Sequence, residues 1–414
     1  MIFSKADMLL PKDCSMTKWS TVACDQYTSE PDYWREVESL TKGAVSAYNL
    51  ILPEVYLEDN DVEQRIERIN LQMAEYLSKG IFESLPSCYI YVERTLKNGS
   101  VRKGVVGAID LEEYDYAKGS KSKIRATEKT VIERIPPRLK VRVNAPVELP
   151  HVMILLDDAR REIIESLSAK KDSFKKVYDF DLMMDSGHIT GYIIDDESAK
   201  EFEYKLESLN DIAAFNAKYS VSESSPLVFA VGDGNHSLAT AKEYYRQIKE
   251  KIIEGDESSA RYALCELVNL HDESLEFEAI HRVIFDIDTD KFIEELSRFA
   301  HEGDGEQSFV LVHEGMATKY SVNNPTANIT VGSVQSFIDN YIESNGGRVD
   351  YIHGDEVVYE LSRGNNMGII LEAMDKSDLF KTVIVDGALP RKTFSMGEAC
   401  DKRFYTEARK IRNM

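Results

Sequence analysis

Apolar and polar positions alternate with two different periods along the chain, which indicates helices and strands in mixed order. Residues 61–82 carry apolar side chains at helical spacing and predict a helix. Apolar runs flank Asn98-Gly99 and predict a β-hairpin, because this dipeptide favours the tight turn between antiparallel strands. A second hairpin is predicted around Ser186-Gly187. The run 149–156 predicts a buried strand that leads into a helix over 157–167.

The rest of the chain continues this mixture. Further helices are predicted over 197–218 and 237–253 and near 290–300 and 333–343, and further strands over 226–231, 261–270, 277–285 and 367–374. The predicted fold class is therefore α+β, with mixed sheets and flanking helices. No repeat or Gly/Ser linker marks a boundary. The expected regions are 1–145, 146–260 with a Gly-Asp-Gly turn and its helix, and 261–414, and they could form one composite unit.

Composition indicates the class of protein and the cellular compartment to expect. The chain has 414 residues, of which 43% are apolar and 29% charged, and this is enough apolar mass for packed cores. The five cysteines lie far apart and form no CxxC pair, which excludes a disulfide framework or a zinc ribbon. No run approaches the roughly 20 apolar residues of a membrane helix. We therefore expect a globular protein of the reduced cytoplasm, with no membrane partner.

Charge narrows the range of ligands. The chain carries 50 basic and 72 acidic residues, a formal net charge of -22, which argues against nucleic acid as a partner. Two segments are basic: 118–142 holds nine basic residues against two acidic ones, and 387–414 holds seven against three. These segments could converge on a small anionic or phosphorylated molecule, or they could be two solvated faces.

The segment with the most chemical information is PLVFAVGDGNHSLATAKEYY, residues 226–245. Its apolar strand ends in Gly232-Asp233-Gly234, and the helical pattern begins almost at once. Glycines allow a sharp turn, and the first backbone N–H groups of a helix attract anions, so the turn could seat a phosphate. Asp233 could hold a metal ion or accept a hydroxyl proton. His236 could donate to an oxyanion or transfer a proton.

A purely structural explanation of the same turn stays open. In that case Asn235 or Ser237 caps the helix and His236 packs without a chemical role. The turn fits the dinucleotide pattern GxGxxG only with its third glycine replaced, and no GxxxxGK[ST], HExxH or GxSxG occurs. The string at 286–292 lacks the glycine of a calcium loop.

Several motifs occur in one order along nearly the whole chain: RATEKTVIERIPPRLKVR, GDGNHSLATA, ELVNLHDESLEFEAIHRVIF, VDYIHGDE and LPRKTF. In this order they resemble the bacterial and archaeal family catalogued as domain of unknown function 1015. The resemblance places the family's Asp-Gly-x-His turn on Asp233, Gly234 and His236. The family commonly has an arginine where this chain has Ser237, so phosphate binding by a side chain at that position is in doubt.

The same resemblance implies further site residues. The family's Glu-x-Thr motif begins at Glu128, and the arginine that follows this motif falls on Arg138. The family's His-Arg pair ends at Arg282, and its Pro-x-Lys motif ends at Lys392. Each has a structural alternative: Glu128 could pair with a neighbouring basic residue, and Arg282 could pair with a surface carboxylate.

More distantly, the turn resembles the second nucleotide-contacting box of the ParB-like superfamily, which includes kinases of free serine. WSTVACDQYTSEPDYW, residues 19–34, would be the first box. This likeness implies a ParB-like nucleotide-binding core with insertions, and a kinase of serine or a similar hydroxylated metabolite that uses ATP or ADP with Mg²⁺. The implied catalytic residues are Asp233, His236 and Glu128, the metal ligand is Asp233, and the nucleotide contacts are Gly232, Gly234, Asn235, Ser237, Arg138, Arg282 and Lys392.

Two other functions fit the sequence. The protein could be a non-catalytic regulator that binds a nucleotide or a metabolite. It could also be a hydrolase that uses Asp233 and His236 to activate water. No nucleophile motif in the sequence decides between these functions.

Overall fold

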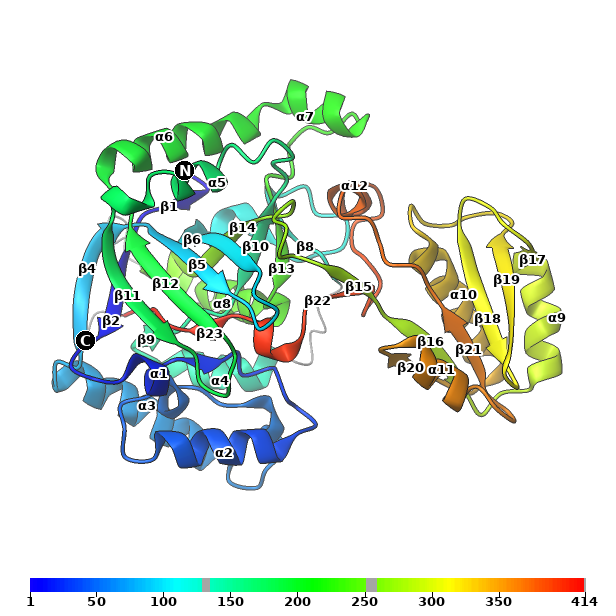
Figure 1. Ribbon diagram of the computed structural model, residues 1–414, viewed down its shortest axis with the longest axis horizontal. Coiled ribbons are helices and arrows are strands. Elements are labelled where there is room, and N and C mark those ends of the chain that lie inside the picture. The colour runs from blue at the N-terminus through cyan, green and yellow to red at the C-terminus, as the bar shows by residue number, and fades with distance from the viewer. Residues whose placement is uncertain (129–134, 251–258, 413–414) are drawn as a thin grey trace. The chain divides into compact units, whose positions relative to one another are not determined.

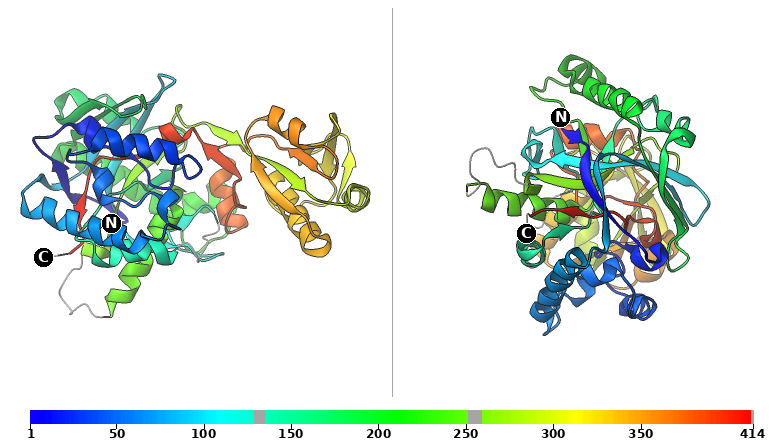
Figure 2. Two further views of the ribbon diagram at one scale, coloured as in Figure 1. Left: turned by 90° about the horizontal axis from the view of Figure 1, so that it is seen from below. Right: turned by 90° about the vertical axis from the view of Figure 1, so that its left-hand side faces the viewer.

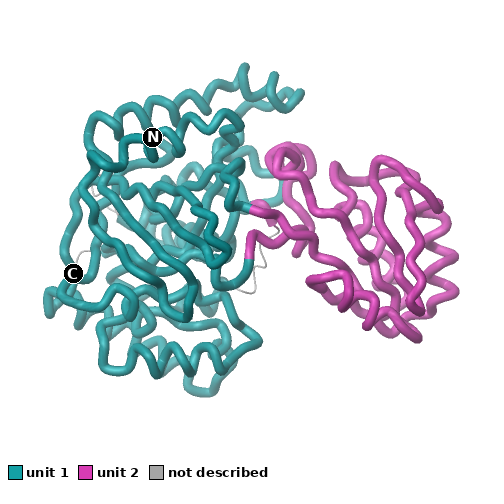
Figure 3. The backbone as a smooth tube through the Cα atoms, in the orientation of Figure 1, with its two compact units in different colours: residues 1–126, 130–275, 398–414 teal, residues 127–129, 276–397 magenta. Residues whose placement is uncertain are grey.

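The computed structural model describes residues 1–128, 135–250 and 259–412. The chain forms two compact units, and both ends of the chain lie in unit 1 (Figure 3). Unit 1 comprises Met1–Ala126, Thr130–Leu275 and Glu398–Met414, and unit 2 comprises Thr127–Lys129 and Glu276–Gly397. The units do not follow the expected divisions at 145 and 260, because the C-terminal segment returns to unit 1 and forms strands there.

One large mixed sheet organises unit 1. Its order is β11-β12-β5-β6-β14-β10-β13-β8-β7, with β1 beside β6 (Figure 1). Most neighbours are antiparallel, whereas β10 with β14, β13 with β8, and β7 with β8 are parallel. The strands are β1 (Phe3–Ser4), β5 (Ile90–Thr95), β6 (Val101–Asp110), β7 (Tyr114–Asp115), β8 (Ile124–Ala126), β10 (Met153–Leu156), β11 (Lys175–Asp181), β12 (His188–Ile193), β13 (Phe229–Asp233) and β14 (Tyr262–Asn269).

Short two-stranded pairs and helices surround this sheet. The pairs are β2 (Ala6–Pro11) with β4 (Phe82–Cys88), β3 (Thr21–Val22) with β23 (Phe404–Tyr405), and β9 (Val147–Glu148) with β24 (Arg409–Lys410). The helices are α1 (Met16–Trp19), α2 (Pro31–Thr41), α3 (Val62–Ser78), α4 (Ile135–Asn144), α5 (Glu165–Ser168), α6 (Asp196–Glu207), α7 (Ile212–Tyr219) and α8 (Asn235–Lys249). The predicted α+β class, mixed sheets with flanking helices, is confirmed.

The sheet is buried on both faces, so unit 1 has three layers. Side chains alternate along β5 and the residue before it: Ile90 and Val92 join a core with α2 and α3, whereas Tyr91 and the preceding Tyr89 join a core with α6 and α8. Figure 1 and the right-hand view of Figure 2 both show the green helices α6 and α7 and the blue helices α2 and α3 on opposite sides of the strands. Period-two alternation of apolar residues on both faces is what a covered sheet requires.

Both predicted hairpins are confirmed. β5 and β6 pair around Asn98-Gly99, where Gly99 has φ +85°. β11 and β12 pair around Ser186-Gly187. The predicted strand over 226–231 and the following helix are also confirmed, as β13 and α8, while residues 251–253 of that predicted helix lie outside the described residues.

Three predicted elements are wrong in extent. The predicted helix over 157–167 is reduced to α5, because the Asp158 carboxylate accepts backbone N–H groups of residues 160, 162 and 163 and holds a turn instead. The predicted helix over 197–218 is two helices, since Asp211 caps a new one, α7. The predicted strand over 277–285 is two strands that belong to different sheets.

Unit 2 is built on a six-stranded antiparallel sheet in the order β17-β19-β18-β21-β16-β20, with a small core of Val283, Val312 and Val358. Its strands are β15 (Phe277–Ala279), β16 (His281–Phe285), β17 (Ala300–Glu302), β18 (Ser308–His313), β19 (Met316–Val322), β20 (Arg348–Ile352), β21 (Met367–Ile370) and β22 (Phe394–Met396). Its helices are α9 (Thr289–Phe299), α10 (Thr330–Asn345), α11 (Asp355–Leu361) and α12 (Asp378–Val385). The predictions near 290–300, 333–343 and 367–374 are confirmed as α9, α10 and β21.

In the part of the chain that the structure describes, none of the helices combines the length and the apolar character that a membrane crossing needs.

Candidate functional site

The turn between β13 and α8 has the backbone geometry of an anion seat. Gly234 is the N-cap of α8 with φ +79°, and no side chain caps the helix there. A Cβ at Gly234 would lie 3.0 Å from the Cα of Val152, so a side chain is disfavoured by a tight contact as well as by the backbone conformation. The first backbone N–H groups of a helix carry its positive end, and an uncapped end leaves them available to an anion.

Asp233 ends β13 at this turn and adds a carboxylate to it. One oxygen, Oδ1, accepts the N–H of Gly234 at 3.0 Å. The other oxygen, Oδ2, is buried and has no hydrogen-bond partner among the described residues. A buried carboxylate oxygen without a donor is unfavourable, so this atom is suited to a metal ion or to the hydroxyl group of a ligand.

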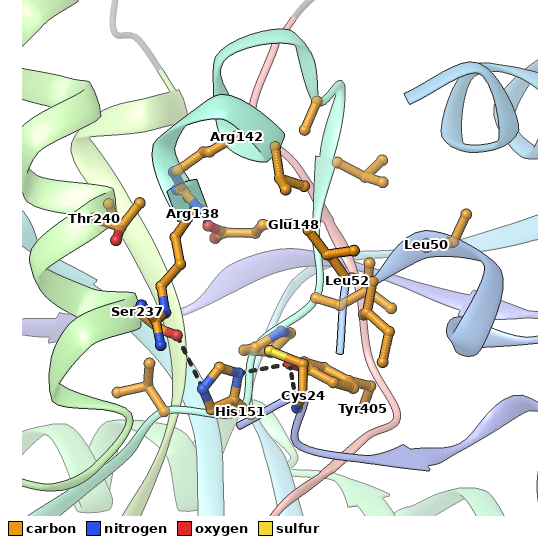
Figure 4. A pocket seen from close by; sticks show the side chains of 18 of the residues that line it. Cys24, Leu50, Leu52, Arg138, Arg142, Glu148, His151, Ser237, Thr240 and Tyr405 are labelled. Atoms are coloured by element: carbon orange, nitrogen blue, oxygen red, sulfur yellow. Dashed lines mark hydrogen bonds and ion pairs between the residues drawn. The ribbon is translucent and has the colours of Figure 1, made fainter. Parts of the chain in front are cut away.

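Ser237, in the first turn of α8, begins a chain of polar groups that crosses the site (Figure 4). Its Oγ lies 2.9 Å from Nε2 of His151. Nδ1 of the same ring lies 2.8 Å from the hydroxyl oxygen of Tyr405, which also accepts the N–H of Cys24 at 3.2 Å. These residues come from α8, from the segment before β10, from β23 and from the segment after β3.

One tautomer of neutral His151 satisfies all of these contacts. In it the Tyr405 hydroxyl accepts the N–H of Cys24 and donates its own hydrogen to Nδ1 of His151. The ring proton of neutral His151 then lies on Nε2 and is donated to Ser237. The hydroxyl hydrogen of Ser237 is left to donate to a ligand. In this tautomer His151 cannot remove a proton from Ser237, so Ser237 is not arranged as an activated nucleophile.

Asp25 lies near Nε2 of His151, the same ring nitrogen that contacts Ser237. Its Oδ2 is 3.8 Å from Nε2 of His151. Burial alone would raise the pKa of Asp25, but His151 in its protonated form, a hydrogen bond from Gln26 and the charges of Lys402 and Arg138 together hold that pKa below its ordinary value. Asp25 is therefore ionised at neutral pH and faces positive groups.

The neighbouring thiol and phenol stay protonated. Burial, followed by the charge of Asp25, raises the pKa of Cys24 to about 12. Burial likewise raises the pKa of Tyr405 well above its ordinary value. A thiolate is the reactive form of cysteine, so Cys24 is not suited to nucleophilic catalysis.

A cavity of about 150 Å³ adjoins this polar chain (Figure 4). Two ion pairs line it, Arg138 with Glu54 and Arg142 with Glu148. Most of its wall is apolar and includes Leu50, Ile51, Leu52, Leu57, Met73, Val141, Val147, Leu149, Leu238, Ala241 and Leu264. Burial would raise the pKa of Glu148, but Arg409 and Arg142 hold it below its ordinary value.

The residues expected at the site divide between the two units. Gly232, Asp233, Gly234, Asn235, His236 and Ser237 lie together at the β13–α8 turn of unit 1. Arg138 also lies in unit 1, and its side chain reaches toward Ser237 in Figure 4. The backbone oxygen of His236 accepts a hydrogen bond from the Thr240 hydroxyl at 2.7 Å.

Glu128, Arg282 and Lys392 belong to unit 2. Glu128 forms a parallel bridge with Leu389, and its charge acts on Arg282. Lys392 is exposed and has φ +56°.

Arg282 is fully buried and directs its guanidinium at acceptors of the protein. Nε donates to Oε1 of Gln335 at 3.0 Å, Nη2 donates to the backbone oxygen of Arg391 at 3.3 Å, and Nη1 donates to the backbone oxygen of Ile280. Burial lowers the pKa of Arg282 to about 10. This arginine fastens the C-terminal LPRKTF segment to unit 2, and its place in nucleotide binding stays a prediction.

Sequence reasoning missed the residues that complete the site in unit 1. His151 has no metal-ligand spacing, Tyr405 lies 254 residues from it, and Cys24 and Asp25 stand out only within the 19–34 segment. The one usable signal was the 19–34 segment, because it resembles the first nucleotide-contacting box of the ParB-like superfamily. Within residues 1–128, 135–250 and 259–412, no three His, Cys, Asp or Glu side chains are placed to share a metal ion.

The fold and the site define an α+β protein in which an uncapped strand–helix turn lies near a small, mostly apolar cavity. The chain belongs to the family described as "Protein of unknown function (DUF1015)", whose profile matches residues 9–341. This membership confirms the resemblance that the sequence motifs indicate. A search of curated protein sequences gives no match.

Among solved structures, free serine kinase in complex with AMP is similar at 10% identity and a TM-score of 0.38, over 72% of this chain and 92% of that one. A conserved hypothetical protein from Pyrococcus furiosus is similar at 11% identity and a TM-score of 0.35, over 70% of this chain and 90% of that one. SbnI with a C-terminal truncation, from Staphylococcus aureus, is similar at 8% identity and a TM-score of 0.37, over 72% and 85%.

Proposed function

We propose that unit 1 is a small-molecule phosphotransferase that uses ATP or ADP with Mg²⁺ to phosphorylate serine or a similar hydroxylated metabolite. One observation carries the proposal: an uncapped helix N-terminus lies next to a buried carboxylate oxygen without a partner, at Gly234 and Asp233. The first feature suits a phosphate, and the second suits a divalent cation or a hydroxyl group.

Positive and donor groups support phosphate binding at this turn. The hydroxyl of Ser237 has its hydrogen left for a ligand, because His151 already donates to its oxygen. Arg138 lies beside Ser237 in the close-up (Figure 4). In the family an arginine often occupies the position of Ser237, so Arg138 would bring a guanidinium to the same place from α4. Charge stabilisation of the transferred group is the main contribution of a protein to phosphoryl transfer.

The residues fit Mg²⁺ in one limited way. Asp233 Oδ2 would be the protein ligand, and the remaining ligands would come from phosphate oxygens and water, as is common for this ion. When bound, Mg²⁺ neutralises charge on the phosphates. Nothing in the described residues supplies a closed protein cage.

Asp25 is suited to accept the proton of the acceptor hydroxyl. It is ionised, and His151 and Lys402 orient and balance its charge. The hydroxyl oxygen would bond to the terminal phosphorus, the bond from that phosphorus to its bridging oxygen would break, and the shortened nucleotide would leave with the electron pair. Asp25 would keep the proton until solvent removes it. The expected role of Glu128 as the base stays an alternative in unit 2.

The experiment combines calorimetry with a transfer assay. We expect ATP or ADP with Mg²⁺ to bind, and Asp233→Asn to lower the transfer rate by at least a hundredfold while nucleotide binding is largely kept. Asp185→Asn, at the exposed tip of the β11–β12 hairpin, is the matched control and should change neither value. Absence of binding by ATP, ADP, CTP and pyrophosphate with Mg²⁺ would reject the proposal.

A non-catalytic nucleotide-binding regulator is the second candidate. The observation that favours it is that the described residues include no group of three His, Cys, Asp or Glu side chains that could hold a metal ion. It predicts tight nucleotide binding with no product, and an effect of Asp233→Asn on affinity alone. Release of phosphate without any acceptor would instead indicate the hydrolase alternative.

A further inference from the structure

The cavity beside Ser237 is larger and more apolar than free serine requires. Its volume is about 150 Å³, and buried apolar side chains such as Leu50, Met73 and Leu264 form much of its wall. An apolar protein cavity of about this size holds a molecule such as benzene. The three carbons of serine would leave most of this wall in contact with water or empty space, which is unfavourable.

Polar groups lie at two separated places on the wall. Figure 4 shows Ser237 and His151 at one end and Arg142 with Glu148 at the other, with the side chain of Arg138, which pairs with Glu54, running between them along one wall. At the far end, Arg142 donates to Glu148 through Nη2 at 2.6 Å, while its Nε is buried and has no hydrogen-bond partner among the described residues. The site thus offers donors at Ser237 and at Nε, and the remaining walls of the cavity are mostly apolar.

We propose that the phosphoryl acceptor is an amphipathic alcohol whose apolar group, about the size of a six-membered ring, fills this cavity. Its hydroxyl group lies at the Ser237 end, and a hydrogen-bond acceptor at the opposite end of the ring binds Nε of Arg142. This inference rests on the proposed phosphotransferase function, since it names the acceptor class of that reaction.

The test uses ligands that differ in one group at a time. Calorimetry compares L-serine, L-threo-3-phenylserine and its 4-hydroxyphenyl analogue, each with and without ADP and Mg²⁺. We expect phenylserine to bind about 30-fold more tightly than serine, which is about 2 kcal/mol at 1.4 kcal/mol per factor of ten. The 4-hydroxyphenyl analogue should gain about fivefold more, because one additional hydrogen bond of ordinary net strength is formed.

Two variants locate the effect in the cavity. Ala241→Leu adds a bulky side chain to the α8 wall and should remove the preference for phenylserine while nucleotide affinity is kept. Ala214→Leu makes the same change on the exposed side of α7 and is its control. Arg142→Lys keeps the positive charge beside Glu148 but lacks Nε, so it should remove only the fivefold gain of the 4-hydroxyphenyl analogue.

The outcomes separate this inference from the proposed function. Equal binding of serine and phenylserine, or a preference that survives Ala241→Leu in a folded protein, would overturn the inference and leave the phosphotransferase proposal standing. Competition between adenosine and phenylserine would also overturn it, since the cavity would then hold the nucleobase. Tight, Ala241-dependent binding of phenylserine without any phosphoryl transfer would support the cavity assignment and reject the function.

Discussion

Replacing Tyr405 by phenylalanine tests the polar chain that orients Ser237. The substitution removes a single oxygen, which bonds Nδ1 of His151 at 2.8 Å and accepts the N–H of Cys24 at 3.2 Å. Tyr405 is 2% exposed and His151 is 4% exposed, so water does not readily replace the lost bonds. Without the phenol, Nδ1 is no longer held as an acceptor, and the proton of neutral His151 is no longer confined to Nε2.

The size of the effect follows from two buried hydrogen bonds. Each contributes about 1 kcal/mol, so we expect Tyr405→Phe to lower the free energy of unfolding of unit 1 by about 2 kcal/mol. Ser237 loses the fixed donor on its oxygen, and one weakened hydrogen bond to a ligand lowers nucleotide affinity about fivefold.

Two measurements check this reasoning. Both tryptophans, Trp19 and Trp34, lie in unit 1, so tryptophan fluorescence during chemical denaturation reports this unit alone. Nitrogen NMR of the imidazole ring, assigned with a His151→Gln variant, reports which nitrogen carries the proton. A proton on Nδ1 of neutral His151 in the unmodified protein would refute the argument, as would an unchanged spectrum and affinity in Tyr405→Phe.

Three further predictions concern conformation and pH. Gly234→Ala should destabilise unit 1 by about 1–2 kcal/mol and weaken nucleotide binding, because φ is +79° and the Cβ would lie 3.0 Å from the Cα of Val152. The denaturation midpoint checks the loss of stability, and calorimetry checks the loss of affinity. Burial would raise the pKa of Asp157, but hydrogen bonds from His271, a tyrosine and a lysine lower it from 3.8 to about 2. About 2 kcal/mol of stability should therefore be lost as pH falls from about 4 to 2. Acid titration of the Asp157→Asn variant should lack this step. Burial would lower the pKa of His188, but two aspartates raise it. The contribution of His188 to stability should therefore be present below about pH 6.5 and lost as pH rises through its pKa in the folded state. His188→Gln should lower the denaturation midpoint at pH 5.5 and leave that midpoint unchanged at pH 8.5.

Local patterns in the sequence were enough for the elements that position the turn. The apolar run before Gly232 and the helical spacing after Ser237 depend only on neighbouring residues, and β13 and α8 follow them. The helix predicted over 157–167 failed for the opposite reason. There a single side chain, Asp158, competes with the helix for backbone N–H groups. The spacing of apolar residues carries no information about that competition.

The polar chain could not be predicted, since its members meet only through the fold. Strand β23 carries Tyr405 back to β3, which places it against His151, 254 positions away in the sequence. A lone histidine gives no signal of its partner. The resemblance supplied Arg138 as a site residue, but no pattern indicated that it lies beside a serine that replaces the family's arginine.

Buried charges on either side of Tyr405 explain how so remote a segment is held at the site. Arg403 binds Glu266 and also Glu407, at 2.6 Å, and Glu407 accepts the Tyr178 hydroxyl at 2.5 Å. All three charged residues are at most 2% exposed, so removing one partner would leave an uncompensated buried charge at a cost of about 3–5 kcal/mol. Because Tyr405 lies between Arg403 and Glu407, the same ion pairs that stabilise this segment fix the phenol that sets the proton on His151, and stability and site geometry depend on one network.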